Sequence, residues 1–200
     1  MEKEIKRYTE IYRGSLRANG FSDLEWRCEA YRKRLSEMYS SEAFIQHNIY
    51  PTMDVIKIYA VIAMCLELKE EGLTDADIIT IINAGFDRIR KKFSIILKLV
   101  DALPNSYKIA ERWNINDHAK RVKDGSITYD VFDVSDGKIE YSISKCMYVE
   151  MFSYYGIRSL CKIFCITDEY AYSRLTKRVK FIRHSDLSEG ECCHDEIIRK

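Results

Sequence analysis

The stretch ITYDVFDVSDGKIEYSIS, residues 127–144, decides the fold class, because here the chain changes from a helical to a strand period. Residues Ile127–Val134 are rich in β-forming side chains. Ser135-Asp136-Gly137 is typical of a tight hairpin, since Asp-Gly suits the positive φ angles of a type I′ turn. Beyond the turn, Ile139, Tyr141 and Ile143 alternate with polar residues, as in a half-buried strand. The stretch therefore predicts two antiparallel strands.

The sequence before this hairpin has helical periodicity. We predict amphipathic helices over residues 2–20 and 23–39, which Asn19-Gly20 separates. Residues Met53–Glu71 are apolar nearly all round, so this helix should be buried. A helix over 75–85 and a second or continuing one over 86–103 follow. Residues 105–123 form a polar connector with short helical tendencies at 107–113 and 117–122.

After the hairpin, the pattern predicts a helix over 147–156 and a helix or pair of short helices over 157–176. Strands are expected at Val179–Ser185 and Glu191–Arg199. The order of elements is then β-β-α-β-β. We expect an α+β protein of one domain, 1–200, in which a helical part, 1–122, packs on a small antiparallel sheet within 123–200.

Composition restricts the class of protein. The chain has 200 residues and a net charge of +1, which gives no electrostatic reason to expect nucleic acid or a membrane as partner. The longest apolar run, Ile58–Leu66, is short for a bilayer span, and the charged start Met1–Arg7 does not resemble a secretory signal. Seven cysteines without an export signal indicate a reducing, cytoplasmic protein with free or metal-bound thiols. A small molecule is the expected partner.

The last quarter of the chain combines thiols with carboxylates. Cys146 and Glu150 are four residues apart and would share a helix face. Cys161, Cys165 and Asp168 would form one stripe of a continuous helix. On the last strand, Cys193, Asp195 and Ile197 share one side, while Cys192, His194 and Ile198 share the other. Each of these residues also has a structural interpretation, since buried cysteines are common without any function and carboxylates often cap or solvate helices.

Three motifs in this order resemble a known family. They are Cys146-x-Tyr148-x-Glu150-x-Phe152, Phe164-Cys165-x-x-Asp168 and Gly190-x-x-Cys193. Together they are similar to the L-2-amino-thiazoline-4-carboxylic acid hydrolase family over roughly residues 125–200. The resemblance implies a hydrolase that acts on cyclic amidine C–N bonds, in which water adds to C2 of the ring and a carbamoyl-cysteine type product forms. It implies catalytic roles for five residues: Cys146, Glu150, Cys165, Asp168 and Cys193.

Several mechanisms are open for such a site. Glu150 or Asp168 could deprotonate the water, or a thiolate of Cys146 or Cys193 could attack C2. Alternatively, Cys146, Cys165 and Cys193 could hold a divalent metal, for which thiolates favour zinc or iron. The residues expected to contact substrate are Tyr148, Arg174 and Arg183, with Lys145 as a further cation. The hypothesis from another class is a non-catalytic domain that binds metal or senses oxidation through its thiols.

Overall fold

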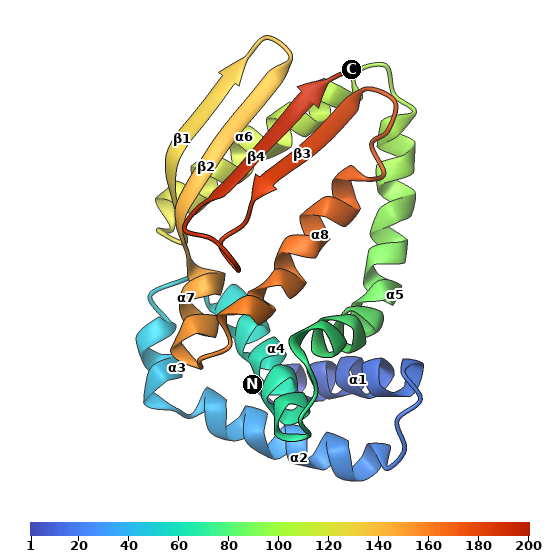
Figure 1. Ribbon diagram of the computed structural model, residues 1–200, viewed down its shortest axis with the longest axis vertical. Coiled ribbons are helices and arrows are strands. Elements are labelled where there is room, and N and C mark those ends of the chain that lie inside the picture. Colours follow the sequence, from blue (N-terminus) through green and yellow to red (C-terminus); the bar gives the residue numbers. More distant parts are fainter. The chain divides into compact units, whose positions relative to one another are not determined.

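The computed structural model describes residues 1–200, except for the side chain of Arg88. The chain divides into two compact units, each built from two segments (Figure 1). Unit 1 comprises Met1–Arg88 and Met151–Ile163, and unit 2 comprises Ile89–Glu150 and Phe164–Lys200. Helices α5 (Asp75–Asp101), α7 (Met147–Tyr154) and α8 (Lys162–Tyr172) each contribute residues to both units.

Unit 1 is helical. Helices α1, α2 and α3 surround the apolar helix α4, whose side chains from Val55 to Cys65 are almost all buried. The bounds are α1 Glu2–Ala18, α2 Leu24–Tyr39, α3 Glu42–His47 and α4 Thr52–Glu70. Buried tyrosines fill much of this core: Tyr12 and Tyr31 lie 4.8 Å apart between ring centroids, and the Tyr31 hydroxyl donates to the carbonyl of Ala60. The later segment joins the same core through Met151 and Phe152, both fully buried.

Unit 2 contains a four-stranded antiparallel sheet in the order β1-β2-β4-β3. The strands are β1 Ile127–Ser135, β2 Lys138–Cys146, β3 Val179–Ser185 and β4 Cys193–Arg199. Gly137 has a φ of 81° in the β1–β2 turn, a conformation that glycine adopts without a steric penalty. The predicted hairpin is confirmed, with Ser135 opposite Lys138. The predicted type I′ turn is wrong, because that type requires a positive φ at both central residues and Asp136 does not have one.

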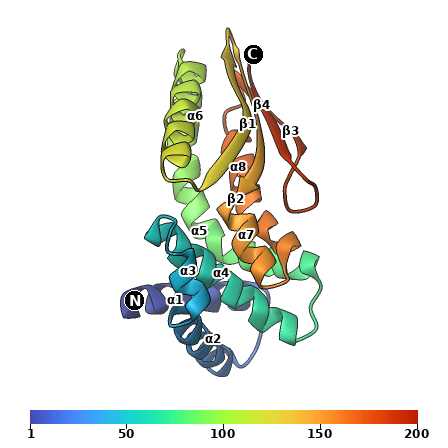
Figure 2. The same cartoon turned by 90° about the vertical axis from the view of Figure 1, so that its left-hand side faces the viewer.

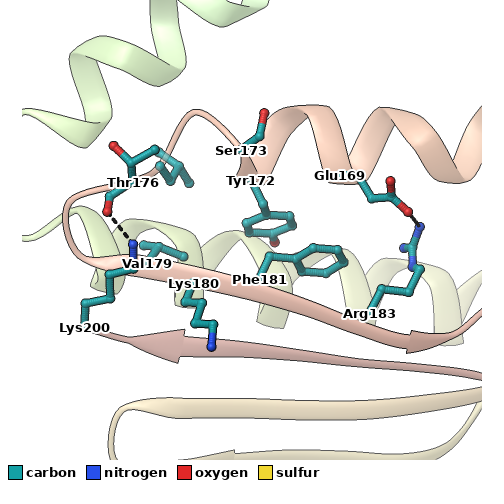
Figure 3. Close-up of a pocket in the computed structure, with 10 residues that line it drawn as sticks. Glu169, Tyr172, Ser173, Thr176, Val179, Lys180, Phe181, Arg183 and Lys200 are labelled. Atoms are coloured by element: carbon teal, nitrogen blue, oxygen red, sulfur yellow. Dashed lines mark hydrogen bonds and ion pairs between the residues drawn. The ribbon is translucent and has the colours of Figure 1, made fainter.

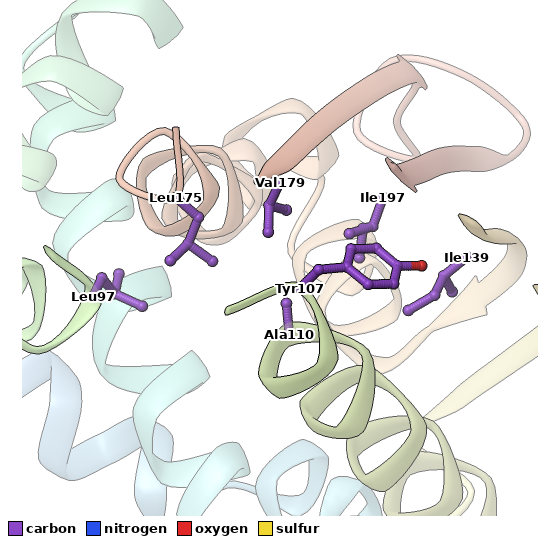
Figure 4. Close-up of a cluster of buried hydrophobic side chains, with 7 residues drawn as sticks. All are labelled: Leu97, Tyr107, Ala110, Ile139, Leu175, Val179 and Ile197. Carbon is purple, nitrogen blue, oxygen red and sulfur yellow. The ribbon is translucent and has the colours of Figure 1, made fainter. Parts of the chain in front are cut away.

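One face of this sheet is covered by helices. Helix α6 (Ser106–Lys123) runs along it, and both views show the helix beside the strands (Figures 1 and 2). Side chains from the end of α5, from α6, from the turn after α8 and from three strands form a single apolar cluster beneath it (Figure 4). Its buried members are Leu97, Tyr107, Ala110, Ile139, Leu175, Val179 and Ile197. Burial of such side chains fixes which face of each strand points inward.

The α+β class, the helical N-terminal part and the strand order along the chain are confirmed. The interpretation of 105–123 as a connector with two short helical stretches is wrong, because α6 is one helix, in which Tyr107 and Ala110 are buried by the sheet. The short helix α3, capped by the Ser41 hydroxyl, was not predicted. None of the described helices combines the length and apolar composition that a bilayer span requires.

Candidate active site

The strand register of unit 2 assembles a polar cluster on the covered face of the sheet. Asp195 of β4 is opposite Tyr141 on β2 and opposite Arg183 on β3. Cys193 lies two residues away on the same face of β4, as the alternation predicted. Three side chains, one from each of three strands, therefore meet around the Asp195 carboxylate.

Asp195 is the centre of this cluster and is 1% exposed. The Arg183 guanidinium donates to both carboxylate oxygens, with Nε 2.9 Å from Oδ1 and Nη2 3.0 Å from Oδ2. The Tyr141 hydroxyl donates to Oδ2 at 3.0 Å. A buried carboxylate is tolerated when such a bidentate partner and further donors compensate for its lost hydration.

Cys193 contacts the same carboxylate. Its thiol donates to Asp195 Oδ2 across 3.5 Å, and the residue is 8% exposed. Burial, and then the negative charge of Asp195, raise the pKa of the Cys193 thiol far above its ordinary value. Cys193 is therefore a neutral thiol at physiological pH, and not a resting thiolate.

Arg183 also connects the strand to helix α8. Its Nη1 donates to the carbonyl oxygen of Cys165 at 3.1 Å and to Glu169 Oε1 at 3.1 Å. The Asp168 carboxylate lies 3.8 Å from Nη2. One guanidinium thus holds a buried carboxylate on β4 and two partly or largely exposed ones on α8.

A pocket of about 510 Å³ opens along α8 and the edge strand β3 (Figure 3). Glu169 and Arg183 stand at one end, and Lys200 lies at the other, where its ammonium group donates to the carbonyl of Thr176 at 2.7 Å. Between them, the rings of Tyr172 and Phe181 are stacked with centroids 4.8 Å apart. The pocket therefore has a carboxylate paired with a guanidinium at one end, aromatic rings in the middle and an ammonium group at the other end.

Cys146 occupies a different position, at the end of β2 where α7 begins. Burial raises the pKa of the Cys146 thiol to about 11, although backbone N–H groups of Val149 and Tyr148 at the helix N-terminus act in the opposite direction. A negative charge on Cys165 would raise the pKa of Cys146 further, and it would also raise the pKa of Cys193. Cys165 is thus close enough to both thiols to influence their ionisation.

The predicted site residues divide between this cluster and its surroundings. Four of them gather around Asp195. Arg183 and Cys193 contact its carboxylate directly. Arg183 also contacts the carbonyl oxygen of Cys165 and the carboxylate of Asp168. Glu150, by contrast, pairs with Lys145 at 3.3 Å.

Two residues expected to contact substrate pack against aromatic rings. The Arg174 guanidinium lies over Tyr170, and the Tyr148 ring is 4.7 Å from that of Phe164. Neither Arg174 nor Tyr148 is among the residues that line the pocket. Cys161 is buried in unit 1, whereas Cys165 belongs to unit 2.

Sequence reasoning missed the parts of the site that depend on pairing between strands. It did not place Tyr141 or Glu169 in the site, and it named Asp195 only as a carboxylate near the thiols. The signal for Tyr141 was its position on the apolar side of the second predicted strand. Glu169 follows Asp168 directly in the sequence, and only its contact with Arg183 in the folded chain identifies it as part of the site.

The cysteine metal site stays a prediction. Among the described residues, the three candidate ligand atoms that lie within 4.8 Å of one another belong to His184, His194 and Glu196, not to Cys146, Cys165 and Cys193. The thiols lie near the covered face of the sheet, whereas the histidines and Glu196 lie on the opposite face of β3 and β4.

Comparison with known proteins agrees with the three motifs. The family model described as L-2-amino-thiazoline-4-carboxylic acid hydrolase matches residues 53–195. No curated protein matches the chain significantly. The match extends well beyond the motif-bearing segment into the helices of unit 1 and covers most of the chain. The chain therefore belongs to the L-2-amino-thiazoline-4-carboxylic acid hydrolase family.

Proposed function

We propose that this protein hydrolyses a small cyclic amidine of the 2-aminothiazoline-4-carboxylate type in the pocket between α8 and β3. Water adds across the C2=N bond of the ring, its oxygen to C2 and a proton to nitrogen. A ring bond at C2 then breaks, and the departing atom takes up the second proton. The product is a carbamoyl-cysteine, carrying the carbamoyl group on nitrogen or on sulfur according to which ring bond breaks.

The distribution of charge in the pocket carries this proposal. A 2-aminothiazoline carboxylate is a small planar molecule with a cationic amidinium at one end and a carboxylate at the other. The Glu169 carboxylate suits the amidinium, the Tyr172–Phe181 pair suits the planar ring, and the Lys200 ammonium suits the carboxylate. Family membership supports the same substrate class.

Glu169 is the general base that this geometry favours. Its carboxylate lines the pocket, and the hydrogen bond from Arg183 fixes its orientation. The Cys193 thiol is kept protonated by burial and by Asp195, which favours water over this thiol as the nucleophile. Asp195 is best suited to positioning Arg183, which in turn holds Glu169 at the pocket.

The test is turnover of L-2-amino-thiazoline-4-carboxylate by the purified, reduced protein, followed by NMR of the carbamoyl product. Glu169→Gln should lower kcat by about 10²–10⁴-fold, the range expected when a well-placed base is lost. Glu191→Gln is the matched control, because this exposed carboxylate is absent from the pocket lining. Equal activity of the two variants would exclude Glu169 as the base, and no turnover by the wild type would overturn the substrate assignment.

Variants of two adjacent cysteines distinguish attack by water from covalent catalysis by a thiol. Cys193→Ser should retain activity within about tenfold of wild type, because the thiol donates one weak hydrogen bond and does not attack the ring. Cys192→Ser changes the exposed neighbouring thiol and serves as control. Loss of all turnover in Cys193→Ser alone, with the fold intact by circular dichroism, would show that the thiol is the nucleophile.

A further inference from the structure

We propose that the uncovered face of the sheet carries a second site, which binds a divalent transition metal through His184, His194 and Glu196. This site is independent of the pocket and of the hydrolase reaction. It lies on the face of β3 and β4 opposite to the Asp195 cluster, and nothing in the three family motifs refers to it.

The strand geometry explains why three such residues meet. His194 and Glu196 are two residues apart on β4, so both point away from the covered face that Cys193 and Asp195 occupy. On β3, the register shifts between Arg183, which is opposite Asp195, and Ser185, which is opposite His194. His184 is the extra residue of this irregularity. Alternation along β3 points it away from the face that Arg183 occupies, and so to the side on which His194 lies.

The distances between the three side chains suit a shared ion after a small adjustment. The imidazole rings of His184 and His194 lie 4.7 Å apart between centroids and are tilted by 31°. His184 Nε2 lies 3.7 Å from Glu196 Oε2, and one ligand atom from each residue falls within 4.8 Å of the others. Ligand atoms around a tetrahedral zinc ion lie roughly 3–3.5 Å apart, so rotation of these partly exposed side chains is enough to close the site.

Neighbouring charges already orient two of the ligands. The His194 Nε2 atom lies 3.0 Å from Glu140 Oε1, a carboxylate–imidazole contact of the kind that positions metal-binding histidines. Lys138 Nζ contacts Glu140 Oε2 at 2.7 Å and Glu196 Oε1 at 2.9 Å. Because Lys138 holds Oε1 of Glu196, the other carboxylate oxygen, Oε2, lies towards His184.

The donor set selects the class of metal. Two imidazoles and one carboxylate suit zinc, nickel, copper and cobalt, whereas magnesium and calcium prefer sets made of oxygen atoms alone. Three protein ligands leave a coordination position for water. A metal here would join edge strand β3 to β4 across the bulge, and binding to the folded state alone would stabilise unit 2.

Cobalt titration of the reduced, metal-stripped protein tests the site, because its spectrum reports the ligands. We expect d–d bands in the visible range without a sulfur-to-cobalt charge-transfer band in the near ultraviolet. His184→Ala and His194→Ala should each weaken binding by at least about tenfold. Ser142→Ala is the matched control, since Ser142 is opposite His194 on β2 and offers no comparable ligand. Thermal unfolding with zinc should shift upward for wild type and for this control only.

Three results would overturn the proposal: no binding by the wild type, equal binding by the histidine variants and wild type, or a strong sulfur charge-transfer band. The last result would assign the metal to the cysteines instead. All the substituted side chains are at least partly exposed, and circular dichroism verifies that each variant folds. Turnover of the cyclic amidine is not a readout of this test. The metal site can therefore be disproved while the proposed function holds, and the proposed function can be disproved while the metal site holds.

Discussion

At the scale of single residues, the arginine–carboxylate pair of Arg183 and Asp195 is the feature on which the candidate site depends. Asp195 is almost completely buried, and Arg183 supplies two of its hydrogen bonds. The pair adds less to stability than its geometry suggests, because both ions lose hydration on burial. Removal of one partner is much more costly, since the other then remains as an uncompensated buried charge.

Arg183→Met should therefore lower the free energy of unfolding by about 3 kcal/mol, measured by urea denaturation. Arg32→Met is the matched control, because Arg32 pairs with Glu29 on an exposed surface and should change stability by less than about 1 kcal/mol. A double variant, Arg183→Met with Asp195→Asn, should recover part of the loss, since it also removes the stranded charge. If the two single arginine variants lose the same stability, the pair does not exist as described.

At the scale of elements, a glycine sets the packing of two helices in unit 1. A Cβ atom at Gly85 of α5 would lie 2.0 Å from Ser15 Oγ and 2.8 Å from the carbonyl oxygen of Ile11, both on α1. The helices can approach so closely only because residue 85 has no side chain. The sequence pattern placed a possible helix end at this glycine, but α5 continues through it without interruption.

Gly85→Ala should destabilise the protein by about 1–3 kcal/mol, because overpacking outweighs the better helix propensity of alanine. Gly14→Ala on α1 is the matched control: nothing lies within 4 Å of its added Cβ, so this substitution should stabilise the protein by up to about 1 kcal/mol. Thermal unfolding of the two variants measures the difference. An increase in stability for both would mean that α1 and α5 are not in close contact at residue 85.

The elements also show how far the sequence predicts the structure. The Asp136-Gly137 turn and the alternation of the strands predicted β1 and β2, and alternation placed Cys193 and Asp195 on one side of β4. The bulge at His184 was not predictable, because it arises from the pairing of two strands and leaves no mark in either one. The role of Glu169 was not predictable either, because it depends on the contact with Arg183 in the folded chain and on no feature of the local sequence.

At the scale of the whole molecule, the chain crosses between its two units several times. The sequence predicted the helical and the sheet-bearing parts, with a boundary near residue 122. The two compact units are divided within α5, α7 and α8, and the buried side chains of Met151 and Phe152 belong with the first helices. Hydrophobic periodicity predicts that a helix is buried, but it contains no information about which distant segment buries it.

Buried tyrosines distributed over both units make the entire chain sensitive to high pH. Burial raises the pKa of the hydroxyl above its ordinary value of 10.0 in Tyr12, Tyr31, Tyr39, Tyr59 and Tyr141. Below pH 10 these groups are protonated in the folded and unfolded chains alike, so they do not make stability depend on pH. Above pH 10 the unfolded chain releases protons that the folded chain retains, and stability falls as pH rises.

Each such group costs about 1.4 kcal/mol per pH unit in this range, so five together cost about 7 kcal/mol per unit. A protein with a typical stability of about 5–15 kcal/mol should then unfold cooperatively between about pH 10 and pH 12. Tyrosinate absorbance and far-ultraviolet circular dichroism, recorded on the same samples, should change together. N-acetyltyrosinamide provides the reference titration. If the buried tyrosines titrate along this reference curve while the helical signal remains constant, their hydroxyls are accessible to water and the tightly packed cores described for the two units are wrong.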